Sequence, residues 1–196
     1  MLTERDRRLY KWIEDYKAIT VNQATELFYE GQYESCRRRL KQLEDRGELK
    51  SYKSKLLNQK VYYQDRKVSD HDLLVLDFAR EITKLGGTIR RFRTQPQYAK
   101  RLIRPDAYLE FVYKKDVYFT LIEVDYTHYT SHKKISMYEY LYHQQELQKE
   151  CYGTFPILII ARPQMDIKYK SNNFEIIHTD YRFKNLARLL LCPITV

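Results

Sequence analysis

Three carboxylates stand where two neighbouring β-strands are expected to end. Asp106 precedes one apolar run, and Glu123 and Asp125 flank a single valine at the end of another. Side chains along a strand alternate between its two faces, so Glu123 and Asp125 lie on the same face. A two-residue turn over 115–116 then places Asp106 opposite Asp125 in a β-hairpin. We therefore expect the three acids to gather at the open end of this hairpin.

Clustered carboxylates repel one another, and the repulsion raises the pKa of at least one of them. Such a group indicates either a bound divalent cation, for which carboxylate oxygens are suitable ligands, or a basic side chain nearby. A three-residue turn in the hairpin shifts the register by one residue and separates the acids. The predicted cluster thus depends on the length of this turn.

Basic residues are concentrated just before this hairpin. Residues 80–104 contain eight of them and a single acid, Glu81. The eight are Arg80, Lys84, Arg90, Arg91, Arg93, Lys100, Arg101 and Arg104. Charge of one sign at this density is typical of a surface that binds phosphate groups. Four of them are predicted to hold a DNA strand: Arg90, Arg91, Arg93 and Arg101.

The first third of the chain has the pattern of a small DNA-binding domain. Apolar residues recur at helical spacing over 3–16, 21–28 and 33–46. Two strand-like segments follow at 48–52 and 60–63. Three helices followed by a hairpin form the outline of a winged helix-turn-helix.

The third predicted helix has a polar face that suits DNA. Its apolar stripe is Cys36, Leu40 and Leu43, so the other side chains face solvent. The predicted DNA contacts on this helix and the following hairpin are Tyr33, Ser35, Arg37, Arg38, Lys41, Lys53 and Lys55. In a helix-turn-helix the N-terminal part of the recognition helix reads base edges, and flanking cations bind phosphates. The alternatives are an ordinary solvated helix face and a winged helix that binds protein.

The overall composition also favours a polyanionic partner. The 196 residues include 35 Lys and Arg against 26 Asp and Glu, a net charge of +9, which attracts nucleic acid or an anionic membrane. Apolar runs fall short of the roughly 20 residues that span a bilayer, and the N-terminus is charged, so no membrane partner and a cytoplasmic location are expected. Cys36, Cys151 and Cys192 are widely spaced and predict neither a disulfide framework nor a zinc site.

A polar stretch at 65–69 is the predicted boundary between two domains, 1–66 and 69–196. The second domain is expected to alternate helices and strands. Its predicted elements are a helix at 69–86, a strand at 88–95, the hairpin, a helix at 131–151, strands at 155–161 and 174–180, and a helix at 182–191. The predicted fold class is therefore α+β or α/β, with a central mixed sheet in the second domain.

Two motifs and the order of these elements resemble a known superfamily. An acid after proline at 105–106, followed by the acid-x-acid pair Glu123 and Asp125, resembles the PD-(D/E)xK nucleases. With the winged helix, the chain up to about Ile160 resembles the replication-relaxation family of plasmids and mobile elements, which is similar to the MobC-type relaxases. The resemblance implies a restriction-endonuclease-like domain that acts at a plasmid origin of replication or transfer. The implied partners are double-stranded DNA, relaxosome or replication proteins and, in a homodimer, a second copy of the chain.

Asp125 stands where the superfamily usually has a lysine. In that chemistry the acids, here Asp106, Glu123 and Asp125, hold Mg²⁺ or Mn²⁺, and the lysine stabilises the charge that develops on the phosphate. Lys133 or Lys134, at the start of the following helix, is predicted to replace it. Two activities follow: a metal-dependent DNA nickase or endonuclease of relaxase type, or a non-catalytic transcriptional regulator or relaxosome accessory protein. A protein-interaction adaptor is a third alternative.

Overall fold

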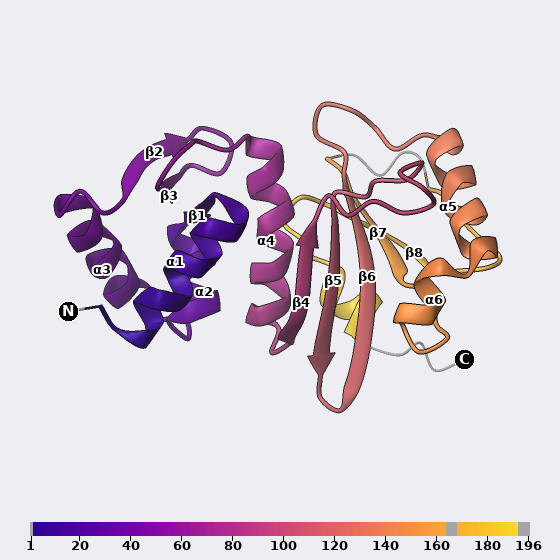
Figure 1. The fold of residues 1–196 in the computed structure, drawn as a ribbon, viewed down its shortest axis with the longest axis horizontal. Helices are drawn as coiled ribbons and strands as arrows, with labels where there is room; N and C mark the ends of the chain where they lie inside the picture. The colour runs from indigo at the N-terminus through magenta and orange to yellow at the C-terminus, as the bar shows by residue number, and fades with distance from the viewer. Residues whose placement is uncertain (1, 164–167, 192–196) are drawn as a thin grey trace. The chain divides into compact units, whose positions relative to one another are not determined.

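The computed structural model of the chain describes residues 2–163 and 168–191, and it divides into two compact units, Met1–Lys84 and Leu85–Val196 (Figure 1). The first unit contains a three-stranded sheet, and the second contains a five-stranded sheet. Both units also contain helices, so the chain has a mixed α+β fold. The predicted fold class is confirmed at this level.

Four helices and a small antiparallel sheet form the first unit. In chain order its elements are α1 (Glu4–Tyr16), β1 (Ala18–Thr20), α2 (Val21–Phe28), α3 (Tyr33–Asp45), β2 (Lys50–Ser54), β3 (Gln59–Tyr63) and α4 (Asp70–Lys84). The strands pair in the order β1-β3-β2. The predicted helices and hairpin are confirmed to within two residues at each end. Strand β1 was not predicted, because its three residues are too few to show an alternating pattern.

Threonine side chains begin the first two helices of this unit. Thr3 accepts a hydrogen bond from the backbone N–H of Asp6 (3.2 Å), and Thr20 accepts one from the backbone N–H of Gln23 (3.1 Å). Asp6 and Gln23 return the contact, because their side chains accept from the backbone N–H of the two threonines. These reciprocal bonds satisfy N–H groups that have no partner within the helix.

Helix α4 belongs to the first unit, whereas the sequence pattern placed it in the second domain. It packs against α2 and β1, and its Leu73 shares a buried cluster with Ala18 and Val61. The division of the chain therefore falls after Lys84 rather than at 65–69. The polar composition of that stretch marks a connection between β3 and α4 within one core.

The second unit is built around a mixed sheet. Its strands are β4 (Thr88–Thr94), β5 (Ala107–Tyr113), β6 (Asp116–Val124), β7 (Ile157–Ala161) and β8 (Ile176–Thr179), in that spatial order. Strands β4, β5 and β6 pair antiparallel, whereas β6, β7 and β8 pair parallel. The helical segments are α5 (His132–Gln144), α6 (Glu146–Glu150) and the short π-helix η1 (Ala187–Leu191). The single helix predicted over 131–151 is thus interrupted, because Gln145 adopts a left-handed conformation with φ 53°.

The register of the β5–β6 hairpin differs from the prediction by two residues. Tyr113 pairs with Asp116, so the turn consists of 114–115 instead of 115–116. Phe111 consequently lies opposite Tyr118, and their rings stack at 5.1 Å between centroids. A shift of two residues leaves every side chain on its predicted face but changes which residues are opposite one another.

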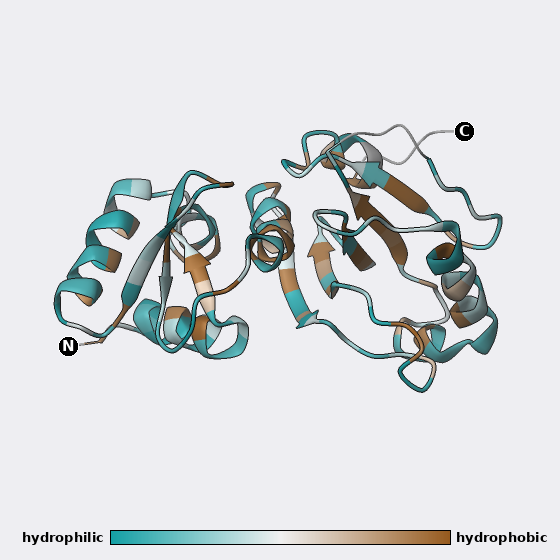
Figure 2. Cartoon of the chain, turned by 90° about the horizontal axis from the view of Figure 1, so that it is seen from above, coloured by the Kyte–Doolittle hydropathy of each residue, from teal (hydrophilic) through white to brown (hydrophobic). Residues whose placement is uncertain are grey.

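One face of the five-stranded sheet forms the main core of the second unit with α5. The buried cluster includes Tyr108 and Leu121 from the sheet and Tyr138 and Leu141 from α5. Hydrophobic residues colour much of these strands brown in Figure 2, while the helices show more of the hydrophilic teal. This core holds the ends of β5 and β6 against α5, and the predicted acidic site lies there.

Two further expectations concern membranes and cysteines. Within residues 2–163 and 168–191, no helix has both the length and the apolar character needed to cross a bilayer. Cys36 and Cys151 are buried free thiols, and Cys192 lies outside the described residues.

Candidate nucleic-acid interface and acidic strand ends

Helix α3 presents a polar face to solvent. Cys36, Leu40 and Leu43 are fully buried, so the stripe predicted to face the core does so. The exposed residues of α3 include every predicted DNA contact on this helix: Tyr33, Ser35, Arg37, Arg38 and Lys41. The hairpin that follows exposes Lys53 and Lys55. Solvent can therefore reach all seven side chains.

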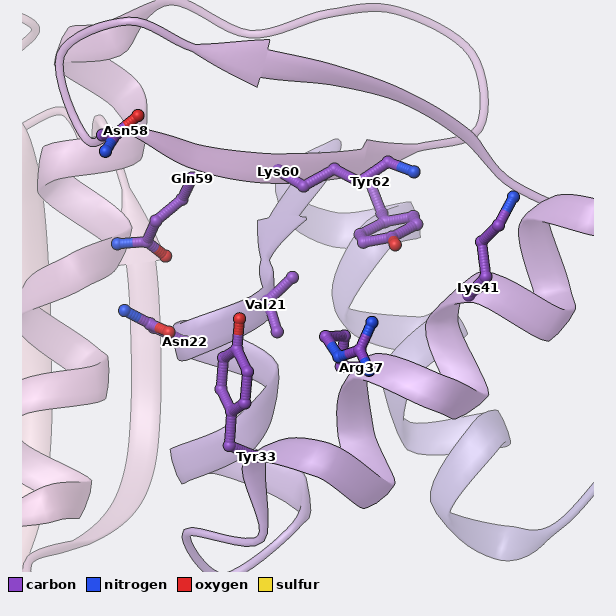
Figure 3. A pocket seen from close by; sticks show the side chains of 9 residues that line it. All are labelled: Val21, Asn22, Tyr33, Arg37, Lys41, Asn58, Gln59, Lys60 and Tyr62. Atoms are coloured by element: carbon purple, nitrogen blue, oxygen red, sulfur yellow. The ribbon is translucent and has the colours of Figure 1, made fainter.

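A pocket of about 370 Å³ lies between the start of α2, the outer face of α3 and strand β3 (Figure 3). Its lining consists of Val21, Asn22, Tyr33, Arg37, Lys41, Asn58, Gln59, Lys60 and Tyr62. Three of the nine are cations, and most of the others are amides or phenols. The sequence pattern had no signal for Asn22, Asn58 or Gln59 as lining residues, because they meet only through the packing of three separate elements.

Carboxylates of α3 neutralise the cations of this pocket. A guanidinium nitrogen of Arg37 lies 2.9 Å from a carboxylate oxygen of Glu34, and Nζ of Lys41 lies 2.6 Å from a carboxylate oxygen of Asp45. Hydrogen bonding to Asp45 raises the pKa of Lys41. Such exposed pairs between neighbouring turns of a helix contribute little stability and exchange readily with other ions.

Glu44 is the most enclosed of these carboxylates. One oxygen lies 2.6 Å from Nζ of Lys60, and the other accepts a hydrogen bond of 2.6 Å from Ser51. The same carboxylate lies 3.6 Å from Nζ of Lys41. Burial acts to raise the pKa of Glu44, but Lys60 and Ser51 outweigh it and lower the pKa. Glu44 therefore connects α3 to both strands of the hairpin.

A second ion pair fixes α3 against α1. Asp6 is buried, and Arg39 donates to both of its oxygens at 3.0 Å and 2.7 Å. Burial acts to raise the pKa of Asp6, but hydrogen bonds from Arg39 and Thr3 outweigh it and lower the pKa to about 2. The side chain that caps α1 thus also sets the position of α3.

Glu123, in the second unit, is enclosed at the end of β6. Nζ of Lys134 lies 2.5 Å from one of its oxygens, and the hydroxyl of Tyr138 donates to the other. Burial raises the pKa of Glu123 from an ordinary 4.5 to about 7, an effect that Lys134 opposes and Asp106 reinforces. Of the two lysines considered from the sequence, Lys134 reaches this carboxylate, whereas Lys133 is exposed.

Asp125 faces a different set of partners. Its Oδ1 accepts hydrogen bonds from the backbone N–H and the hydroxyl of Thr130, both at 2.7 Å, and its Oδ2 accepts one from Arg162. Arg162 is 2% exposed, and its guanidinium carbon lies within 6 Å of the ring centres of Tyr129 and Tyr169. Arg162 was not anticipated, because it comes from the end of β7 and no local pattern connects it with Asp125.

Asp106 completes the predicted set, but it does not join Asp125. Because of the shifted register it lies beside Glu123, and its Oδ2 accepts a hydrogen bond of 2.7 Å from the backbone N–H of Val124. The expected gathering of three acids on one cation is therefore replaced by separate contacts. Within the described residues, no group of three Asp, Glu, His or Cys side chains is placed to hold a metal.

The donor set consequently does not fit Mg²⁺ or Mn²⁺ as arranged. Glu123 uses its two oxygens for Lys134 and Tyr138, and Asp125 uses its own for Thr130 and Arg162. A divalent cation requires carboxylate oxygens that are directed at one point. Basic side chains already fill the role that the predicted cation would have.

Acids also neutralise part of the basic segment 80–104. A guanidinium nitrogen of Arg93 lies 3.0 Å from a carboxylate oxygen of Glu150. Guanidinium nitrogens of Arg91 lie 3.8 Å from a carboxylate oxygen of Glu110 and 3.9 Å from one of Glu150. Arg80 is paired with Asp77 at 2.7 Å. The exposed members of the segment are Lys84, Arg90, Arg91, Lys100, Arg101 and Arg104. Among the four predicted DNA contacts, Arg90 and Arg101 fit a phosphate-binding role best.

Exposed basic side chains lie on α3 and the β2–β3 hairpin in the first unit, and on β4 and the loop after it in the second unit. Comparison with known proteins adds no identification, because no protein-family model, no curated protein and no solved structure matches this chain.

Proposed function

We propose that the chain binds double-stranded DNA through its first unit, which acts as a winged helix-turn-helix. The order of α1, β1, α2, α3 and the β2–β3 hairpin, with a three-stranded antiparallel sheet, supports this proposal. In a winged helix the third helix enters the major groove, and the hairpin is the wing that contacts the phosphate backbone. The exposed Lys53 and Lys55 suit the wing.

The outer face of α3 is the observation that carries this proposal. Arg37, Arg38 and Lys41 are exposed on the side opposite the buried stripe, next to the polar residues Tyr33 and Ser35. Cations supply affinity for phosphates, and polar side chains read base edges. Glu34 and Asp45, which pair with Arg37 and Lys41, are themselves exposed, so phosphate groups can replace them.

In this proposal the second unit, a restriction-endonuclease-like fold, supports DNA binding without cleaving DNA. Arg90 and Arg101 provide exposed positive charge. The carboxylates Glu123 and Asp125 are bound to Lys134 and Arg162, which suits a structural role. The resemblance to the replication-relaxation family implies that this DNA belongs to a plasmid or mobile element. The proposed role is thus that of a regulator or relaxosome accessory protein at an origin.

Fluorescence anisotropy with a labelled duplex tests DNA binding. We expect Arg37→Gln together with Arg38→Gln to lower the affinity by about tenfold or more, and to reduce the slope of log K against log salt by about 1.8. Arg7→Gln is the matched control, because Arg7 is an exposed arginine on α1 that is paired with a glutamate in the same way as Arg37. Equal affinity of the double variant and the wild type would rule out α3 as the DNA-binding element.

A metal-dependent nickase is the second candidate, because Lys134 contacts Glu123 as a displaced catalytic lysine would. Incubation of supercoiled plasmid with Mg²⁺ or Mn²⁺ separates the two candidates. Nicking by the wild type that is lost in Glu123→Ala supports the nickase, provided that circular dichroism shows the variant to be folded. Tight binding of plasmid without nicking supports the accessory protein.

A further inference from the structure

The pocket beside α3 brings cations from two elements to one place. Arg37 and Lys41 come from α3, and Lys60 comes from β3 (Figure 3). The amides of Asn22 and Gln59 line the same space. Hydrogen-bond donors from three elements that surround one pocket suit an anion with several acceptor oxygens.

A phosphate diester has the chemistry that this pocket would recognise. A guanidinium group can bind two of its oxygens at once, and an ammonium group supplies a compact charge. Nζ of Lys60 also lies 5.3 Å from the ring centre of Tyr62, which restricts the position of the lysine. The pocket lies beside the exposed face of α3, where the backbone of bound DNA would pass.

In the protein without DNA, carboxylates of α3 form ion pairs with these cations. Glu34 holds Arg37, Asp45 holds Lys41, and Glu44 holds Lys60. Three positive and three negative charges therefore cancel. Glu44 differs from the other two acids in being mostly buried, with its side chain 22% exposed. It also contacts Lys41, so one carboxylate bridges the two lysines of the pocket.

We propose that this pocket binds one phosphate group of the DNA backbone, and that Glu44 is an internal competitor for the same cations. This inference rests on the proposed function, since it names how that surface engages its ligand. A phosphate group replaces the carboxylate of Glu44 at Lys60 and Lys41 when DNA binds. The affinity for DNA is then set by the difference between these two ion pairings.

The inference predicts opposite effects for the two partners of one ion pair. Glu44→Gln keeps the size of the side chain and a hydrogen-bond acceptor for Ser51 but removes the charge, and we expect it to tighten DNA binding by about threefold to tenfold. Lys60→Gln is expected to weaken binding by about tenfold and to reduce the salt slope by about 0.9, whereas Lys60→Arg retains binding. Asp15→Asn is the matched control, because Asp15 pairs with Lys11 on α1 and neither residue lines the pocket.

The experiment is an anisotropy titration of each full-length variant with a labelled duplex, with thermal unfolding to verify that each variant is folded. Tighter binding by Glu44→Gln and weaker binding by Lys60→Gln support the inference. DNA binding that is unaffected by both changes overturns it and leaves the proposed function intact. A wild type that does not bind DNA overturns the proposed function itself. If inorganic phosphate raises the Tm of the wild type but not of Lys60→Gln, while DNA affinity is equal for both, the pocket serves free anions and the inference is overturned.

Discussion

Nζ of Lys134 lies 2.5 Å from a carboxylate oxygen of Glu123, which is 2% exposed. The lysine comes from the first turn of α5, and the glutamate comes from the end of β6. Tyr138, one turn further along α5, donates to the other oxygen. The contact therefore attaches the start of α5 to the end of the sheet, at the place where the sequence predicted a catalytic cation.

Stability of the second unit should depend on the protonation of Glu123. Its pKa is raised from 4.5 to about 7, so protonation of Glu123 stabilises the folded state. This stabilisation is complete below pH 4.5 and is lost as the pH rises through 7. Glu123→Gln removes this dependence. We expect the difference in unfolding free energy between wild type and variant to change across this window, as measured by urea denaturation at a series of pH values. Parallel pH profiles for the two proteins would contradict the raised pKa.

Arg162 should be the most costly of the charged residues to remove from the second unit. Arg162→Met leaves the Asp125 carboxylate buried without its cation, and breaking a buried pair in this way costs roughly 3–5 kcal/mol. Adding Asp125→Asn removes the unpaired charge and keeps an acceptor for Thr130. We therefore expect the double variant to recover a large part of the loss in guanidinium denaturation. A double variant no more stable than Arg162→Met would show that the arginine acts through packing against Tyr129 and Tyr169.

The pair of Asp6 and Arg39 makes the first unit sensitive to acid. The pKa of Asp6 is lowered to about 2, so the stabilisation is present above the ordinary value of 3.8 and is lost as the pH falls toward 2. Asp6→Asn should cost about 2 kcal/mol at neutral pH and flatten the acid limb of the stability profile. Denaturation followed by the fluorescence of Trp12 in α1 measures both effects. Glu4→Gln, which affects an exposed pair on the same helix, should leave the profile unchanged.

The loop before β5 should contribute to the salt dependence of DNA binding. Lys100 and Arg101 are exposed at its tip, and the bridge between Tyr98 and Ile103 closes the base of the loop. Lys100→Gln with Arg101→Gln should reduce the slope of log K against log salt by up to about 1.8 if both contact phosphates. Lys149→Gln, an exposed lysine in α6, is the control. An unchanged slope in the double variant would show that this loop makes no contact with the DNA phosphates.

The sequence predicted best the features that depend on local pattern. The stripe of Cys36, Leu40 and Leu43 fixed the inward face of α3, because burial of apolar side chains at helical spacing decides how a helix packs. The hairpin and the faces of its side chains were also predictable, since strand alternation has a period of two. The position of the turn was not predictable, because a two-residue turn at 114–115 or at 115–116 leaves every side chain on the same face. The two positions differ only in which residues pair across the strands, such as Phe111 with Tyr118.

Ion pairs between residues that are distant in the sequence could not be predicted from any local pattern. Asp125 obtains its charge partner from Arg162, which is 37 residues away, and Asp6 obtains its own from Arg39, which is 33 residues away. An acid at a strand end has the same sequence appearance whether a metal ion or an arginine neutralises it. Only the tertiary structure shows which cation is present.

The change from antiparallel to parallel pairing within the second sheet has a consequence for folding. Strands β5 and β6 are joined by a tight turn, whereas β6 reaches β7 only after the whole of α5 and α6, so the entropy lost on closing the chain is small for the first pair and larger for the second. The antiparallel strands are therefore expected to assemble first. Asp125 then receives Arg162, which follows β7, only in the later step, so this carboxylate stays hydrated until the parallel strands have paired.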